Sequence, residues 1–169
     1  MKALTELLSA ESLELSKGEL ASMCSLTVDA QVFGIDASKV REVLGRCSIQ
    51  KVPLAPAFIA GVITNRGEVL TTVDLRALLG LEVRAGARTV LVLEDKDEGE
   101  WFGLVVDLAG DIVSVSPKTL ESNPSTLSAR GKALFDGAYK LPAGLMIRLN
   151  VGMLRPAFWA KIDSSEAKA

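Results

Sequence analysis

Residues that could carry out acid–base or metal chemistry are scarce in this sequence, which contains no histidine. Histidine is the commonest general acid–base at neutral pH and a frequent metal ligand. Its absence excludes Ser-His-Asp and Cys-His catalysis and most zinc sites. The phosphate loop, the dinucleotide fingerprint and the nucleophile elbow are missing as well. We therefore expect that the protein is not an enzyme, and we assign it no catalytic residue, metal ligand or cofactor.

Two carboxylates and two thiols are the remaining candidates for chemistry. Asp107 and Asp111 lie close together in one long apolar stretch. Such a pair can act as acid and base only in a substrate cleft that shifts a pKa, whereas carboxylates at a bend usually accept local backbone hydrogen bonds. Cys24 and Cys47 lack the spacing of a metal site. We expect structural roles for all four residues.

A polar tip between two apolar pairs is the best candidate for recognition. In GVITNRGEVL (61–70), the tip is Thr64–Gly67. Gly67 suits a turn, because a positive φ costs little for glycine. Arg66 is either a solvated turn residue, since exposed charges contribute little to stability, or a contact for a partner, since its planar fork of donors fits carboxylates and carbonyls. The residue types alone leave both interpretations open.

Short strands and turns must position this tip. Apolar–polar alternation predicts a strand over 24–28, followed by a turn and a second strand through 33–35. The run 89–95 is apolar on both faces and predicts a central strand, and 101–115 predicts a long strand bent near 107–110. The last predicted strands form a hairpin over 134–149.

Helical signals are brief. Asp36 predicts the N-cap of a one- or two-turn helix that includes Val40, Val43 and Leu44, and Asp74 predicts the cap of another short helix. Because no long helix separates the strands, the pattern favours a barrel or a sandwich over repeated βαβ units.

Composition limits the partners. The chain has 169 residues, 49% of them hydrophobic, and a formal net charge of −2. The sequence shows no basic stripe for nucleic acid. It has no apolar run near the roughly 20 residues that span a bilayer. We expect a cytoplasmic protein with no nucleic-acid partner and no direct membrane insertion.

The two ends of the chain are expected to lie outside the folded domain. Residues 1–22 are short of apolar pattern and predict a flexible N-terminal arm, and 156–169 predict a polar C-terminal tail. Phe158 and Trp159 stand out in that tail. They either dock on the body of the protein or bind a partner, and the sequence leaves both open.

Three segments resemble the CheW-like coupling proteins of bacterial chemotaxis. VPLAPAFIAGVITNRGEVLTTVDLRALLGL (52–81) follows the family's order of P-x-x-P, G-V-I, R-G and V-D-L-R. FGIDASKVREVL (33–44) matches its V-x-E, and FGLVVDLAGDIVSV (102–115) matches its G-L-V-V-D. The order and spacing together carry the resemblance. The tip departs from it, because Thr64-Asn65 replace the usual Asn-Leu before Arg-Gly.

The resemblance implies a mainly β fold of two small five-stranded SH3-like barrels packed side by side, with short helices. We place the CheW-like domain at 23–155 and the boundary between its barrels near 82–90.

A role without catalysis is also implied, namely that of an adaptor coupling methyl-accepting chemoreceptors to a CheA-type histidine kinase. Its partners would be the kinase regulatory domain, the cytoplasmic signalling tip of the receptor and other CheW-like proteins in a membrane-associated array. The partner-binding positions carried over from the family pattern or its tip are Val40, Glu42, Gly61, Thr64, Asn65, Arg66 and Gly67.

Two alternatives stay open at this point. One is a generic SH3-like interaction module, although a chain with one tyrosine and two tryptophans can hardly line an aromatic peptide groove. The other is the regulatory domain of a kinase-linked enzyme.

Overall fold

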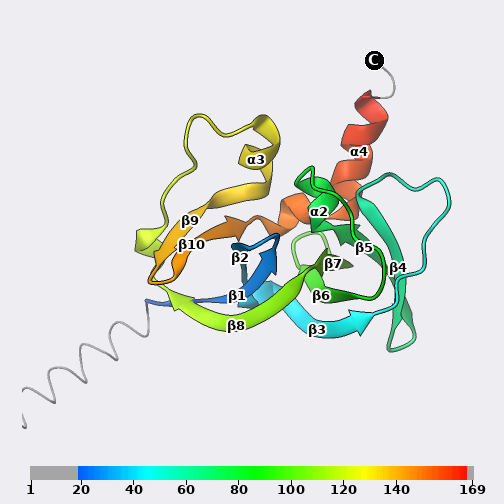
Figure 1. Ribbon diagram of the computed structural model, residues 1–169, viewed down its shortest axis with the longest axis horizontal. Helices are drawn as coiled ribbons and strands as arrows, with labels where there is room; N and C mark the ends of the chain where they lie inside the picture. The colour runs from blue at the N-terminus through cyan, green and yellow to red at the C-terminus, as the bar shows by residue number, and fades with distance from the viewer. Residues whose placement is uncertain (1–18, 167–169) are drawn as a thin grey trace, which may run out of the picture.

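The computed structural model describes residues 19–166 and shows a mainly β protein with two five-stranded sheets. Each sheet curls on itself, and the two lie side by side (Figure 1). We name the first sheet barrel 1 and the second barrel 2. In sheet order, barrel 1 consists of β8 (Leu108–Val115), β1 (Ala21–Val28), β2 (Gln31–Asp36), β10 (Gly144–Leu149) and β9 (Phe135–Leu141).

Barrel 2 repeats this arrangement. Its sheet order is β3 (Val40–Cys47), β6 (Arg88–Asp95), β7 (Glu100–Val106), β5 (Glu68–Asp74) and β4 (Ile59–Asn65). Each sheet contains one parallel pair, β2–β10 in barrel 1 and β5–β7 in barrel 2, and its other pairs are antiparallel. The predicted mainly β fold of two five-stranded barrels is therefore confirmed.

Each barrel is closed by a short bridge from the chain that follows its first edge strand. In barrel 2, Gln50 exchanges two backbone hydrogen bonds with Val62 of β4, at 2.9 and 2.8 Å. In barrel 1, Glu121 pairs with Ala138 of β9 in the same way. In each barrel a glycine with positive φ lies against the bridge. It is Gly61 with φ +148° in barrel 2 and Gly137 with φ +131° in barrel 1. A β-carbon at Gly61 would overlap the carbonyl of Gln50.

The chain interleaves the two barrels, so the predicted boundary near 82–90 is wrong. Strands β1 and β2 begin barrel 1, β3 to β7 build the whole of barrel 2, and β8 to β10 return to complete barrel 1. The crossings lie at 37–39 and at Asp107. Residues 82–87 only join two elements of barrel 2. The polar composition marked a loop correctly, but composition does not reveal that the strands on both sides of a loop belong to one sheet.

Short helices occupy the connections between strands. They are η1 (Ala37–Lys39), α2 (Leu75–Leu78), η2 (Pro117–Thr119), α3 (Ala129–Leu134) and η3 (Val151–Leu154). Asp74 caps α2 as predicted, because its carboxylate accepts hydrogen bonds from the N–H groups of Arg76 and Ala77. Asp36 caps η1 through Ser38 N–H.

The predicted helix at Val40, Val43 and Leu44 is wrong, because these residues belong to strand β3. Helical spacing and strand alternation both fit this short stretch. Pairing with β6 decides between them, since Val43 and Leu44 face Leu91 and Val90 in an antiparallel ladder. A register shift between Val40 and Glu42 bends the strand where it leaves η1.

The largest apolar core is shared by both barrels. One cluster of buried side chains includes Phe33 and Ile35 from barrel 1 and Leu91 and Phe102 from barrel 2. All four side chains are at most 2% exposed. Hydrophobic burial therefore holds the barrels together, because separating them would expose these residues to water.

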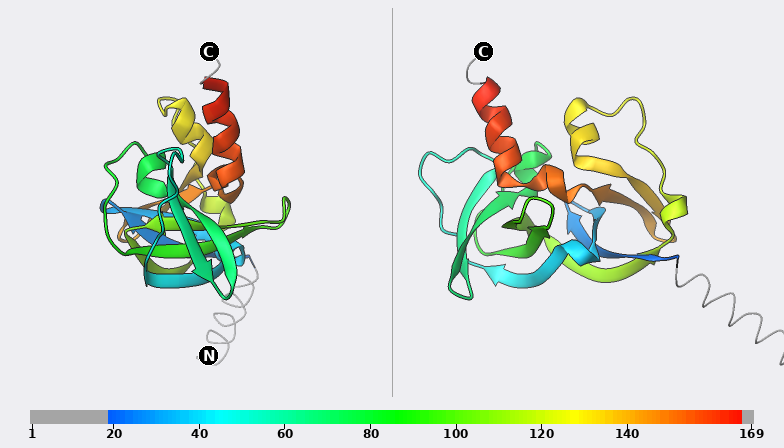
Figure 2. Two further views of the ribbon diagram at one scale, coloured as in Figure 1. Left: turned by 90° about the vertical axis from the view of Figure 1, so that its right-hand side faces the viewer. Right: turned by 180° about the vertical axis from the view of Figure 1, so that it is seen from behind.

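Helix α4 (Pro156–Glu166) packs its first turn on the shared core through Phe158 and Trp159, so the polar tail expected outside the folded domain is helical from residue 156 to residue 166. In Figure 1 it rises beside α2, on the side away from α3, and two further views show it projecting from the same side of the molecule (Figure 2). Trp159 is 5% exposed and donates its indole N–H to the carbonyl of Met153 at 2.6 Å. Of the two readings left open for this aromatic pair, docking on the body is the observed one for Trp159. Local composition did not indicate that this segment folds, because the surface on which Trp159 docks is formed by residues distant in the sequence.

At the other end, we predicted a flexible arm over 1–22. Residues 1–18 of that arm lie outside the described residues. Its last two residues, Ala21 and Ser22, already belong to strand β1.

A buried ion-pair cluster joins the barrels where the chain crosses from β7 to β8. Arg76 of α2 donates Nε and Nη2 to the two carboxylate oxygens of Asp107, both at 2.8 Å, and its Nη2 also reaches Asp29 at 3.1 Å. Asp107 accepts the backbone N–H of Asp29 at 2.9 Å and lies 3.5 Å from Arg88. We name Arg76, Asp107, Asp29 and Arg88 the inter-barrel clamp.

The clamp shifts the titration of its members. Hydrogen bonding from Arg76 lowers the pKa of Asp107 to about 2, against an ordinary value of 3.8. The reciprocal bond raises the pKa of Arg76. Asp107 is thus a charged structural residue, and Asp111, at an exposed position of β8, does not share its partners. The expected structural role of Asp107 has a specific form, which is to hold two barrels in one orientation.

Closure of barrel 2 predicts a strong effect of one methyl group. Gly61→Ala is expected to lower the free energy of unfolding by about 2–4 kcal/mol, because the β-carbon would break the Gln50–Val62 bridge and occupy a strained φ. Gly45→Ala on β3 is the control, since nothing lies within 4 Å of its added β-carbon. Urea denaturation of both variants measures the difference. Equal stability of Gly61→Ala and wild type would contradict this role.

The clamp predicts a defined pH dependence. The pKa of Asp107 is lower in the folded chain than in the unfolded chain, so its stabilisation is present above about pH 4 and is lost as the pH falls toward 2. Asp107→Asn should lose about 3 kcal/mol at neutral pH, because the buried guanidinium of Arg76 keeps no counter-charge of equal strength. Its stability should also change less than that of wild type between pH 4 and pH 2.

Urea unfolding across this pH range, with Asp111→Asn as the control carboxylate, provides the measurement. A variant of Asp107 that keeps both the stability and the acid slope of wild type would show that the clamp does not hold the barrels.

Candidate functional site

The predicted polar tip is the turn of the β4–β5 hairpin, and its geometry depends on two residues. Arg66 and Gly67 both have positive φ, +50° and +81°. Asn65 pairs with Glu68 directly before and after them. A two-residue turn with both φ values positive matches the twist of the flanking strands. The turn therefore projects Arg66 from the end of barrel 2 in one defined conformation.

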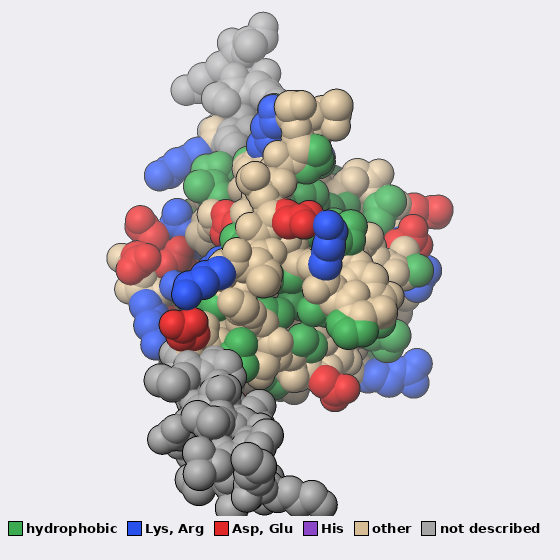
Figure 3. All heavy atoms as spheres, turned by 90° about the vertical axis from the view of Figure 1, so that its left-hand side faces the viewer, with side chains coloured by type: hydrophobic (Ala, Val, Ile, Leu, Met, Phe, Trp, Pro, Cys, Tyr) green, Lys and Arg blue, Asp and Glu red, His purple; other side chains and the backbone are tan. Residues whose placement is uncertain are grey.

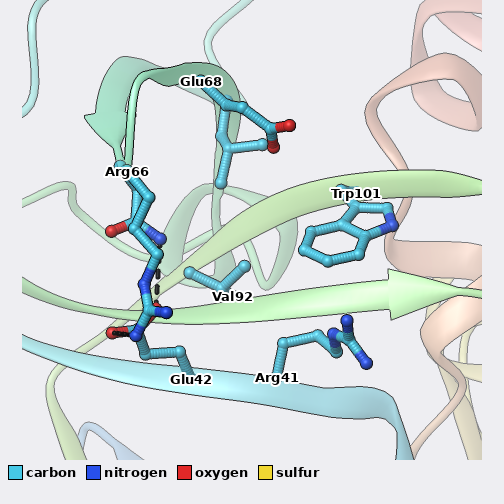
Figure 4. A pocket seen from close by; sticks show the side chains of 8 residues that line it. Arg41, Glu42, Arg66, Glu68, Val92 and Trp101 are labelled. Carbon is cyan, nitrogen blue, oxygen red and sulfur yellow. Dashed lines mark hydrogen bonds and ion pairs between the residues drawn. The ribbon is translucent and has the colours of Figure 1, made fainter.

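A contact between distant segments fixes the tip. The carboxylate of Glu42 on β3 accepts a hydrogen bond from Asn65 Nδ2 at 3.1 Å and another from Arg66 Nη2 at 3.4 Å. Figure 4 shows the Arg66 side chain extending down to Glu42. The side chain of Arg66 is nevertheless 80% exposed. The glutamate of V-x-E and the arginine of R-G are thus brought together by the fold, 24 residues apart in sequence.

The remaining predicted positions divide between surface and interior. Thr64 and Gly67 are exposed at the tip. Val40 is half-buried and packs against the shared core. Gly61 is buried, and its close approach to Gln50 gives it a packing role, so it cannot itself contact a partner in this conformation.

A shallow hollow lies beside the tip, and several of its residues were missed by the sequence reading. Its lining consists of Arg41, Glu42, Asn65, Arg66, Glu68, Leu70, Val92 and Trp101. Figure 4 shows Val92 between the Arg66 and Trp101 sides of the hollow, with Glu68 on the upper rim. We name this feature the tip hollow.

Trp101 forms the far wall of the tip hollow. Of the neighbouring aromatic residues Trp101 and Phe102, only Phe102 is buried, whereas Trp101 is 39% exposed. Strand alternation explains the difference, because consecutive residues of β7 point to opposite faces. The guanidinium of Arg41 lies 4.5 Å from the centre of the Trp101 ring. Alternation was the signal that could have placed Trp101 outside.

The chemistry available at the tip hollow is that of recognition. Its charged groups engage one another, as Arg66 does with Glu42 and Arg41 does with Glu94 at 3.3 Å. Within residues 19–166, no group of three or more Cys, Asp or Glu side chains could hold a metal ion. Cys24 and Cys47 are free thiols, and burial raises the pKa of Cys24. The arrangement supplies donors, acceptors and an aromatic face for a binding partner.

Other exposed groups are more dispersed. On the face of barrel 1 drawn in Figure 3, acidic and basic side chains are interspersed around a mixed polar and apolar centre. Exposed apolar residues occur on the two edge strands at the base of the barrels, Val43 on β3 and Leu108 and Ile112 on β8.

Among the residues described, every helix is too short or too polar to cross a bilayer.

Comparison with known proteins gives this site its context. The family model described as CheW-like domain matches residues 22–155. The chain belongs to the CheW-like family. The Chemotaxis protein CheW of Rhizobium meliloti (strain 1021) is 31% identical over 121 residues, which cover 68% of this chain and 78% of the relative. That of Treponema pallidum (strain Nichols) is 21% identical over 144 residues, covering 80% and 82%.

A solved structure shares the fold of this CheW-like chain. The scaffolding protein TtCheW from Thermoanaerobacter tengcongensis superposes with a TM-score of 0.68 at 24% sequence identity. The match covers 77% of this chain and 88% of that chain. The family resemblance and its two-barrel architecture are therefore both confirmed.

The turn geometry predicts that Arg66 can be removed without cost to the fold. Arg66→Asn should be as stable as wild type or more stable by about 0.5 kcal/mol, because Asn-Gly is the preferred pair for this turn and an exposed ion pair contributes little. Thermal and urea unfolding measure the change. Gly67→Val is the opposing control, since a branched residue at φ +81° should destabilise the hairpin. Loss of stability in Arg66→Asn would mean that the Glu42 contact holds the barrel.

Proposed function

We propose that this CheW-like protein is a non-catalytic adaptor that couples methyl-accepting chemoreceptors to a CheA-type histidine kinase. Its place would be the cytoplasm, where it is recruited to membrane-associated receptor arrays. The relatives named above are chemotaxis and scaffolding proteins, which supports this class of role. The observation that carries the proposal is the tip itself, where Arg66 is 80% exposed and yet held by Glu42.

An arginine in this state is suited to binding. Ordering a long side chain on association costs about 0.5–1.5 kcal/mol, and a contact made beforehand reduces that cost. Glu42 and the tight two-residue turn restrict Arg66 before any partner arrives. Among the described residues, Arg66 donates one hydrogen bond, so most of its N–H groups are open to an acceptor. Exposure, orientation and free donors together favour the contact interpretation over a solvated turn.

An adaptor needs more than one surface, and the fold supports at least two. The tip and its hollow lie at the end of barrel 2. The exposed apolar residues Val43, Leu108 and Ile112 lie on β3 and β8. We propose that the receptor signalling tip and the kinase regulatory domain use separate surfaces, and that other CheW-like proteins in the array compete for them. Modest individual contacts then gain strength by avidity in the array.

The proposal predicts that charge reversal at the tip weakens a complex without unfolding the protein. Arg66→Glu should reduce affinity for one partner by about 2 kcal/mol or more, roughly 30-fold, because it removes donors and places a repelling charge beside Glu42. Arg66→Lys should recover part of the affinity, since lysine keeps the charge and loses the fork. Titration of the receptor fragment and the kinase regulatory domain, each separately, measures both effects.

Thermal unfolding of the same preparations is the control. If Arg66→Glu binds both partners with the affinity of wild type, Arg66 is only a solvated turn residue. Failure of the wild-type chain to bind either partner would overturn the adaptor proposal itself.

A further inference from the structure

We propose that the tip hollow receives one apolar side chain of the partner that contacts Arg66, with carboxylates of that partner on either side of it bound by Arg66 and by Arg41. Trp101 and Arg41 would then be specificity-determining residues of the adaptor. This inference rests on the proposed function and adds the chemistry of the docked segment.

The size of the hollow favours a single side chain. Its volume is about 260 Å³, below the roughly 300–1,000 Å³ of sites that enclose small molecules. An α-helix, with a diameter of about 10–12 Å, would lie across the opening and could not enter it. A single side chain that projects from a folded partner is small enough for this volume and narrow enough for this opening.

The inner surface of the hollow is apolar. Leu70 and Val92 are buried, at 6% and 1% exposure, and belong to the core of barrel 2. The ring of Trp101 forms the wall opposite the Arg66 tip. Because Trp101 is 39% exposed, an apolar group placed here would remove both its own surface and part of the ring from water. Binding in the hollow is therefore favourable for an apolar side chain.

Both arginines are oriented by a carboxylate and keep donors for another. Arg66 is bonded through Nη2 to Glu42, whose second oxygen accepts from Asn65. Arg41 Nε lies 3.3 Å from Glu94 Oε2 while its guanidinium stacks on Trp101. In Figure 4 the two guanidinium groups lie on either side of Val92. One open fork on each side of an apolar floor fits carboxylates that flank the apolar side chain on both sides.

Glu68 sets the orientation of that segment. It lies on the opposite rim from the two arginines (Figure 4), and it forms no ion pair within residues 19–166. A carboxylate near Glu68 would be repelled, so the acidic groups of the partner must lie on the rim that carries Arg66 and Arg41. Hot spots of this kind, with Trp and Arg around a small pocket and charges at the rim, dominate binding in many interfaces.

The test uses the full-length chain, titrated separately with the receptor fragment and the kinase regulatory domain. Trp101→Ala should weaken the same complex that Arg66→Asn weakens, by about 30-fold, as expected of a hot-spot residue. Trp101→Phe should lose less, because it keeps an aromatic wall. Arg41→Ala should weaken this complex, and Glu68→Gln should leave it unchanged or tighten it. Leu145→Ala, on barrel 1 and 52% exposed, is the control for an unrelated apolar surface.

Tryptophan emission provides an independent readout that a stability defect would not imitate. The chain has two tryptophans, and Trp159 is 5% exposed, so acrylamide quenches chiefly Trp101. Complex formation should protect wild type from quenching, and the protection should vanish in Trp101→Phe. Thermal unfolding identifies any variant that fails to fold.

The outcomes separate the two proposals. If Arg66→Asn weakens a complex while Trp101→Ala and Trp101→Phe bind within about twofold of wild type, with unchanged quenching on binding, the tip hollow is not a docking site and the adaptor proposal stands. If Trp101→Ala and Arg66→Asn weaken different partners, the single-segment inference is overturned. If wild type binds neither partner, both proposals fail.

Discussion

The bidentate ion pair between Arg76 and Asp107 lies where the chain passes from one barrel to the other, and the two-barrel arrangement depends on it. Asp107 also holds the β1–β2 turn through the N–H of Asp29. The pair therefore connects α2 of barrel 2, the first hairpin of barrel 1 and the crossing between them. A buried charge that loses its partner is destabilising, so the pair favours the arrangement in which Arg76 and Asp107 meet. Hydrogen bonds have directional requirements that apolar contacts lack, and the pair therefore helps to fix the relative orientation of the barrels.

The interleaved chain and the clamp reinforce each other. Since barrel 2 is inserted between β2 and β8 of barrel 1, the strands of barrel 1 come from two separate parts of the chain, and two crossings join them to barrel 2. Apolar side chains from both barrels form one cluster, and helix α4 adds Trp159 to it at the junction. Hydrophobic burial supplies most of the stabilisation, whereas the ion pairs determine orientation. This arrangement would hold the proposed binding surfaces at a constant separation, as the proposed adaptor role requires.

The tip gains its properties from this rigidity. Glu42, Arg66 and Trp101 come from β3, the β4–β5 turn and β7, and each alone would be an ordinary exposed side chain. Closure of barrel 2 at Gln50 and Val62 keeps β3 and β4 close enough for Glu42 to reach Asn65 and Arg66. The arginine is thus restrained by a partner within the same barrel while it stays exposed to solvent. Restraint combined with exposure distinguishes it from an arginine that is merely solvated.

The amino-acid sequence by itself determined the mainly β class, the short caps at Asp36 and Asp74, and the position of the polar tip at Arg66 and Gly67, whereas the expectation of two barrels came from the family resemblance. These features depend on neighbouring residues: alternation, capping and turn chemistry act over a few positions. Only the tertiary structure decided that β3 is a strand and that the barrels are interleaved. It also decided that residues 156–166 form a helix that docks through Trp159, that Gly61 is buried, and that Trp101 faces outward on the tip hollow. Each of these depends on contacts between residues far apart in the chain, and a local pattern that fits two structures equally well does not contain the energy of those contacts.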